Sequence, residues 1–160
     1  MTTDHGIYTP ELLLRMFRKA AALRKEMLAQ GFTDNGGAIH SASRILDILC
    51  NRLRYPGLSH INNYRHHAAA EFTEAAWEVY CAGGKVMLEH VAPLRALTIE
   101  AIRLVDGGAT DEELSSYLKG TYRLVLMTAE ETRDLNRRNR SRIDPERLSA
   151  FRVIVRPEQR

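Results

Sequence analysis

Residues 85–94 read KVMLEHVAPL, and this stretch decides the fold because the character of the chain changes there. Its first part, KVMLEHV, is short, is β-branched at Val86 and Val91, and lies between a glycine pair and Pro93. These signals predict a β-strand, whereas the chain before it has a helical pattern. The strand also ends on an acidic residue beside a histidine, Glu89 and His90, which raises the question of whether its end carries chemistry.

Three helices are predicted before this strand. The first has Thr9 as its N-cap and ends at Gly31, with apolar residues recurring on one face between them. The second follows the sequence HSAS and ends at YPG. The third is expected to begin near Asn62 or Asn63 and to continue to the glycine pair, with an apolar face made of Ala68, Phe72, Ala76 and Val79.

After the strand, a helix is predicted from about Leu94 to Asp106, and the pair Thr110 and Glu113 has the spacing of a capping box that opens another helix. TYRLVLM then reads as a second strand. Thr128 and Glu131 repeat the capping-box spacing at the start of a last helix.

We expect residues 85–91 and 122–127 to pair as antiparallel strands, with the helix that begins near Thr128 packed against them. FRVIV at 151–155 is a candidate terminal strand. The predicted fold class is therefore α+β and mostly helical, with a small two-stranded hairpin and a packed helix in the C-terminal half.

A chain of 160 residues fits a single domain. Its expected parts are a helical part at 1–84, a strand-helix-strand-helix module at 85–147, and a basic tail or terminal strand at 148–160. The charged fraction of 27% and the hydrophobic fraction of 44% are typical of a soluble globular protein. The N-terminus lacks the order of a signal peptide, and no apolar run is long enough to span a membrane, so we expect a cytoplasmic protein without a membrane partner.

Positive charge gathers near the C-terminus, although the formal net charge is only +3. A clustered basic surface is typical of proteins that contact nucleic-acid phosphates. The candidate nucleic-acid-binding residues are Arg133, Arg137, Arg138, Arg140 and Arg142. The alternative is a solvated helix face in which these arginines pair with Glu130, Glu131 and Asp134.

A carboxylate beside a histidine suits metal-assisted hydrolysis of a phosphodiester. The carboxylate of Glu89 offers a hard oxygen ligand to Mg²⁺, and the imidazole of His90 can accept a proton near neutral pH. The segment LNRRNRSRID adds Asn136 and Asn139, three residues apart on one predicted helix face.

Two of these motifs resemble those of a known family. EHVAPL resembles the first-strand motif of HNH, or His-Me finger, endonucleases, and NRSRID resembles the helix that closes their site. The stretch LVLMTAEETRDLNRRNRSRIDPE is also similar to the strand and helix of the nuclease module in CRISPR effector proteins. The resemblance covers about residues 85–147.

The resemblance implies a metal-dependent endonuclease in which His90 is the catalytic base that activates water. Glu89 and Asn139 would be metal ligands, with Asn136 as the alternative helical ligand, and Arg142 would meet a phosphate. The implied cofactor is Mg²⁺ or Mn²⁺, and the implied partner is nucleic acid, with DNA favoured over RNA.

The residues leave other interpretations open. His90 can be a core histidine satisfied by a backbone carbonyl, with Glu89 paired to Lys85 or Arg95 at the surface. In that case we expect a non-catalytic helical interaction protein, such as an adaptor or an inhibitor of a nucleic-acid enzyme, that uses the arginine-rich C-terminal face on nucleic acid or a protein partner. A degenerate nuclease fold that binds without cutting lies between the two.

Overall fold

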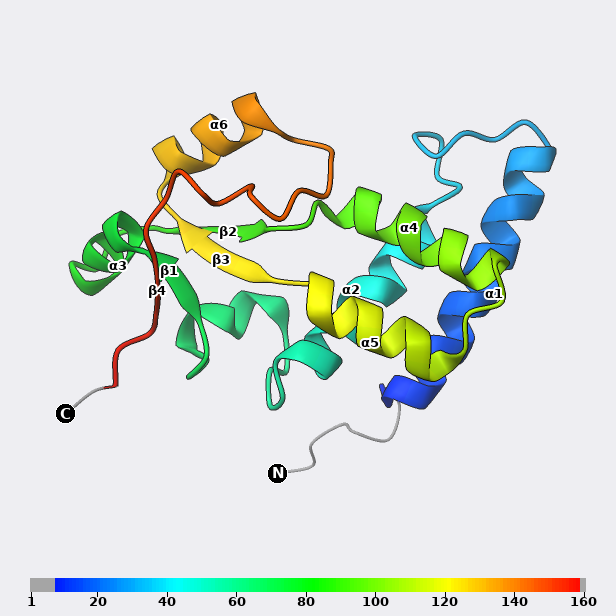
Figure 1. Ribbon diagram of the computed structural model, residues 1–160, viewed down its shortest axis with the longest axis horizontal. Helices are drawn as coiled ribbons and strands as arrows, with labels where there is room; N and C mark the ends of the chain where they lie inside the picture. The colour runs from blue at the N-terminus through cyan, green and yellow to red at the C-terminus, as the bar shows by residue number, and fades with distance from the viewer. Residues whose placement is uncertain (1–7, 159–160) are drawn as a thin grey trace. The chain divides into compact units, whose positions relative to one another are not determined.

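A computed structural model describes residues 8–158, and it has the mostly helical α+β fold that the sequence predicts (Figure 1). The chain divides into two compact units. The helical unit consists of the chain up to Gly57 together with Leu94–Thr121. The sheet unit consists of Leu58–Pro93 together with the chain from Tyr122 onward.

None of the helices in residues 8–158 combines the length and the apolar character that crossing a bilayer requires.

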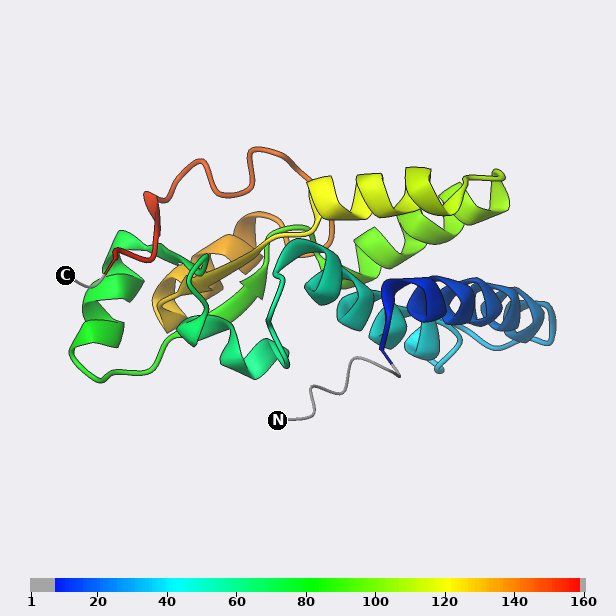
Figure 2. The same cartoon turned by 90° about the horizontal axis from the view of Figure 1, so that it is seen from below.

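Within the described residues, the helical unit has two helix pairs, and the predicted bounds of the helix at 94–106 are confirmed, whereas the helix expected to follow HSAS already begins at His40. Its helices are α1 (Pro10–Ala29), α2 (His40–Arg54), α4 (Leu94–Asp106) and α5 (Asp111–Thr121). In Figure 2, α1 lies beside α2, and α4 lies beside α5 in a second layer. The core between the layers includes Phe17, Leu46, Leu97 and Leu114, all fully buried.

Local chemistry sets the helix ends of this unit. The hydroxyl of Thr9 accepts a hydrogen bond from the amide of Leu12, which caps α1. The capping box of α5 is formed as predicted, because Thr110 accepts from the amide of Glu113 and the Glu113 carboxylate accepts in return.

Two ion pairs of α1 join it to the rest of the helical unit. Arg24 forms a two-pronged pair with Asp34 in the loop after α1, at 2.9 and 2.8 Å. Arg18 binds Asp111 at the start of α5, at 2.8 Å. These two cations of α1 are therefore already neutralised within the unit.

Within residues 8–158, the sheet unit contains four strands, one more than the expected hairpin and candidate terminal strand together. They are β1 (Glu71–Thr73), β2 (Met87–His90), β3 (Leu124–Met127) and β4 (Val153–Val155), in the spatial order β2-β3-β1-β4. The predicted antiparallel pairing of β2 with β3 is confirmed, and so is the terminal strand β4. The hairpin interpretation missed β1, which pairs in parallel with β3 and antiparallel with β4.

The predicted continuous third helix is wrong. Its range is divided into a 3₁₀-helix η1 (Ile61–His66), the strand β1 and a short helix α3 (Glu74–Cys81). Phe72 pairs with β3 on one side and β4 on the other, so tertiary hydrogen bonding overrides the helical pattern. Thr73 then caps α3 by accepting from the amide of Ala76.

A buried tyrosine fixes the start of β1 against β3. The hydroxyl of Tyr64 donates to the carbonyl of Leu124 at 2.8 Å and accepts from the amide of Glu71 at 2.9 Å. The guanidinium of Arg123 holds the Glu71 carboxylate at 2.8 and 2.6 Å. The partners of β1 thus come from a distant segment of the chain, which explains why local patterning did not predict it.

The last helix, α6 (Ala129–Arg138), packs on one face of the sheet as predicted. Its Leu135 forms a small core with Val125 and Met127 of β3 and with Leu148, and Val91 packs against the edge of this cluster. The predicted capping box of Thr128 and Glu131 is present. This face of the sheet carries the candidate site.

Candidate nucleic-acid interface

Glu89 and His90 lie on opposite faces of the sheet. Both belong to β2, where Glu89 is opposite Val125 and His90 is opposite Leu124. Side chains of directly opposed residues share a face, and consecutive residues of a strand alternate. Because Val125 packs against α6, Glu89 faces α6 and His90 faces the other side.

His90 is held by a tyrosine on its own face of the sheet. Its Nε2 lies 3.4 Å from the hydroxyl of Tyr122, and the two rings meet edge to face with centroids 5.6 Å apart. Tyr122 is almost fully buried. These contacts are those of a packed, half-buried side chain that lies against a tyrosine.

Glu89 lies close to a positive charge that the sequence analysis did not single out. Burial raises the pKa of its carboxyl, while the nearby charges of Arg147 and His90 oppose the increase. Arg95, one of the partners considered for Glu89, instead donates to Asn35 within the helical unit. Arg147 is therefore the main electrostatic neighbour of Glu89 in this structure.

Arg147 connects the end of β2 with the end of α6. It is only 7% exposed, and its Nη1 donates to the backbone carbonyls of His90 and Val91 at 2.6 and 3.0 Å. Its Nε donates to the carbonyl of Asn139 at 2.9 Å. Burial lowers its pKa, and the carboxylate of Glu89 opposes that change. The buried guanidinium of Arg147 therefore fixes the backbone at the end of β2 relative to the backbone at the end of α6.

Sequence reasoning missed Arg147 because its partners are mostly backbone carbonyls, which carry no residue signature. One feature of the sequence pointed to a buried Arg147. Its neighbour Leu148 is an apolar residue in an otherwise polar loop, and Leu148 packs into the core.

The two asparagines use their side-chain oxygens within the protein. The Oδ1 of Asn139 accepts from the amides of Ser141 and Arg142, and its Nδ2 donates to the carbonyl of Arg142. Asn139 thus ends α6 and closes the following turn. The Oδ1 of Asn136 lies 3.4 Å from Nη2 of Arg147.

These residues do not present a converging ligand set for a metal ion in this structure. Glu89 faces α6 while His90 faces away from it, and both amide oxygens already accept hydrogen bonds. The cation of Arg147 lies among them, and positive charge disfavours a second cation at close range. Within residues 8–158, no three histidine, cysteine, aspartate or glutamate side chains gather where they could hold a metal ion.

The predicted arginine surface lies on α6 and the turn after it. A hollow of about 610 Å³ is lined by Arg133, Asn136, Arg137 and Arg140. Arg138 and Arg142 are exposed nearby in the chain. One ion pair of the alternative interpretation, a salt-bridged surface, is present, because Arg137 pairs with Asp134. Glu131, another expected partner, is instead used by the capping box and by Thr73.

Comparisons with protein-family models, with curated proteins and with solved structures gave no match for this chain.

Proposed function

We propose that this protein binds the phosphate backbone of nucleic acid through the hollow on α6, and that it does so without cleaving the strand. The observation that carries the proposal is the lining of the hollow, which offers hydrogen-bond donors and positive charge. Phosphate oxygens are acceptors and carry negative charge, so this lining matches their chemistry.

The orientation of Asn136 makes the lining more selective for anions. Its Oδ1 is directed to Arg147, which leaves its Nδ2 as the group available to the hollow. Together with the guanidinium groups of Arg133, Arg137 and Arg140, the amide supplies a set of donors around one concave surface. A bidentate guanidinium-phosphate contact is the geometry that arginine favours over lysine.

The charge of this surface is largely uncompensated. Arg137 has a partner in Asp134, but Arg133, Arg138, Arg140 and Arg142 form no ion pair with any residue among 8–158. Unpaired surface cations keep their full field for a polyanion, and binding releases the counterions that the polyanion had condensed.

The binding function is favoured over hydrolysis because the residues expected to hold a metal are arranged differently. A general base needs to reach the water that a metal orients, and His90 faces away from Glu89, Asn136 and α6. The nuclease hypothesis stays a prediction, and the cleavage experiment below tests it directly.

The binding test uses labelled double-stranded DNA, single-stranded DNA and RNA of one length, with affinity measured across a salt series. Wild-type affinity should fall steeply with salt, because each neutralised phosphate adds about 0.9 to the logarithmic slope. Replacing Arg133, Arg137 and Arg140 together by Gln should weaken binding by about tenfold or more and reduce that slope by about 2 to 3.

A matched variant distinguishes this hollow from general positive charge. Arg15, Arg44 and Arg52 lie on α1 and α2 and have no ion-pair partner among the described residues, so their triple Gln variant removes the same charge elsewhere. Equal losses in the two triple variants would contradict a specific site on α6.

A second substitution tests the role of the amide. Asn136→Asp replaces the donor that faces the hollow with a carboxylate oxygen, while retaining an acceptor for Arg147. We expect reduced binding with an unchanged melting temperature. Unchanged binding would remove Asn136 from the site.

The cleavage test incubates wild type and His90→Ala with plasmid DNA and with RNA in the presence of Mg²⁺ or Mn²⁺. Intact substrate with both proteins is the expected result. Cleavage by wild type that stops with EDTA and is lost in His90→Ala would overturn the non-cutting proposal and support the nuclease hypothesis.

A further inference from the structure

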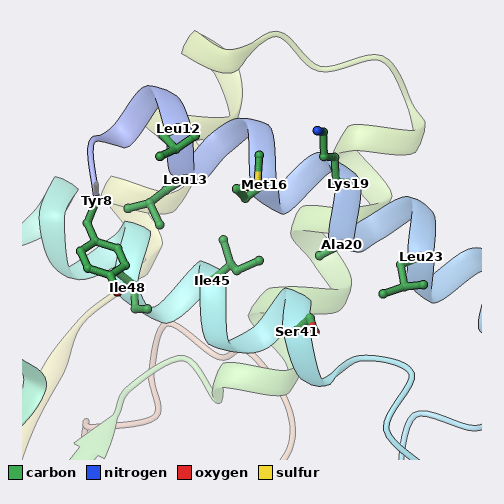
Figure 3. Close-up of a pocket in the computed structure, with 10 residues that line it drawn as sticks. All are labelled: Tyr8, Leu12, Leu13, Met16, Lys19, Ala20, Leu23, Ser41, Ile45 and Ile48. Atoms are coloured by element: carbon green, nitrogen blue, oxygen red, sulfur yellow. The ribbon is translucent and has the colours of Figure 1, made fainter. Parts of the chain in front are cut away.

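A second surface, in the helical unit, is apolar rather than basic. A groove of about 510 Å³ runs between α1 and α2, and Figure 3 shows the side chains that line it. Its apolar lining includes Tyr8, Leu12, Met16, Leu23, Ile45 and Ile48. The lining also includes the buried residues Leu13 and Ala20, so the floor of the groove borders the core into which α1 packs Leu14 and Phe17.

The two ends of the groove carry strongly exposed apolar side chains. Tyr8 is 41% exposed and Leu23 is 47% exposed, and Figure 3 places them at opposite ends of the lining. Between them, Leu12, Met16, Ile45 and Ile48 are half-buried, and a contiguous apolar surface that stays partly open to solvent is typical of an interaction site. From Leu12 to Leu23 the lining follows about three helical turns, or about 16 Å.

We propose that this groove is a docking site for an amphipathic helix of a partner protein, with acidic residues flanking its apolar stripe. A helix fits because a stripe at positions i, i+4, i+7 and i+11 covers the same length as the row along α1. This inference does not depend on the proposed binding of nucleic acid by the sheet unit.

The acidic flanks follow from the charges beside the groove. Lys19 is the charged side chain in its lining, and Arg15 lies one turn earlier on the same side of α1. On α2, Arg44 and Arg52 lie one turn before and one turn after Ile48. These four cations have no ion-pair partner among the described residues.

Opposing charge is placed away from the middle of this surface. The acidic residues of α1 are Glu11 and Glu26, near its two ends, and Asp47 of α2 is buried. The other arginines of α1, Arg18 and Arg24, are neutralised by Asp111 and Asp34. The centre of the groove thus has a cationic border, which favours an anionic partner and disfavours a cationic one.

The test uses two fluorescein-labelled helical peptides of about 14 residues with an identical leucine stripe. One has Glu at its flanking positions and the other has Lys. Fluorescence anisotropy with the full chain should show micromolar binding of the Glu peptide and binding at least about tenfold weaker for the Lys peptide. Equal affinities, or no binding of either peptide, would overturn the proposal.

Reversing the charge of exposed residues tests the cationic border of the groove without changing the buried core. Lys19→Glu with Arg44→Glu should invert the preference between the two peptides. The control is Lys25→Glu with Lys119→Glu, which changes two exposed lysines of the same unit that are outside the lining. An identical effect of control and reversal variants would contradict the assigned border.

An apolar substitution tests the groove itself, with a matched control. Leu23→Asp should abolish peptide binding, whereas Ile99→Asp on α4, which is 41% exposed, should leave it unchanged. Competition by a fatty acid with loss of charge preference would instead assign the groove to an amphiphile. A dimer in sedimentation that Leu23→Asp dissociates would assign it to a second copy of this chain, and either result would overturn the proposal.

Discussion

Glu131 of α6 accepts a hydrogen bond from the hydroxyl of Thr73, at 2.6 Å, at the residue where β1 ends and α3 begins. The same carboxylate oxygen accepts from the amide of Thr128 in the capping box of α6. One side chain therefore supports the starts of two helices in the sheet unit.

We expect Glu131→Ala to cost more stability than Glu113→Ala. Glu113 serves an exposed capping box in α5 and has no third partner comparable to Thr73 among the described residues. Glu131→Ala also leaves the buried Thr73 hydroxyl without its acceptor. We therefore expect it to lower the free energy of unfolding by about 2–3 kcal/mol, and Glu113→Ala to lower it by about 0.5–1 kcal/mol. Urea unfolding measures both, and equal costs would contradict the bridging role.

Replacing Arg147 should destabilise the sheet unit strongly. Arg147→Met leaves the carbonyls of His90, Val91 and Asn139 without their donor, and each unsatisfied buried group costs about 1–3 kcal/mol. Arg147→Lys retains the charge but cannot form the same fork, so its cost should be intermediate. If Arg147→Met left the free energy of unfolding unchanged, water would be replacing the guanidinium without loss of stability.

Glu89 should make stability depend on pH in the direction opposite to a typical surface carboxylate. Burial raises the pKa of its carboxyl in the folded state, so the folded protein holds the proton more tightly than the unfolded chain. Its favourable contribution is fully present below the unfolded pKa of about 4.3 and is lost as pH rises through the folded pKa.

The comparison that isolates this effect is Glu89→Gln against wild type. Their difference in unfolding free energy should shift in favour of the variant between about pH 4 and about pH 7. A shift in favour of wild type over that range would mean that attraction to Arg147 outweighs burial.

The expectation of one folding domain stays a prediction, and Trp77 provides a way to test it. Trp77 is the single tryptophan of the chain and lies in α3 of the sheet unit, so its fluorescence reports that unit, whereas far-ultraviolet circular dichroism reports both. We expect the two signals to give coincident urea transitions. Separate midpoints would show that the units unfold independently.

Sequence reasoning succeeded where the determinants are local. The ends of α4 and both capping boxes depend on residues within one or two turns, and they were predicted. β1 was missed because Phe72 becomes a strand residue only through hydrogen bonds to β3 and β4. Its surroundings in the sequence carry a helical pattern, which the distant strands override.

In the candidate site, too, local features were predictable and features that depend on distant parts of the chain were not. The arginine surface was predictable because charge clusters in the sequence remain clustered on a helix and the turn after it. The placement of Glu89 and His90 depended on whether β2 continues through both residues, which their identities do not decide. Arg147 was not singled out because its partners are backbone carbonyls, which leave no residue signature in the sequence.

The route of the chain between β2 and β3 has a consequence for engineering. The chain leaves the sheet unit after Pro93 and returns at Tyr122, yet the amide of Val91 donates to the carbonyl of Arg123 at 2.8 Å, so the two ends of this excursion are already neighbours. In topological terms α4 and α5 are an insert in a β-hairpin. A short turn in place of residues 94–121 would turn the sheet unit into an uninterrupted polypeptide, and the arginine surface could then be transplanted without the helical unit.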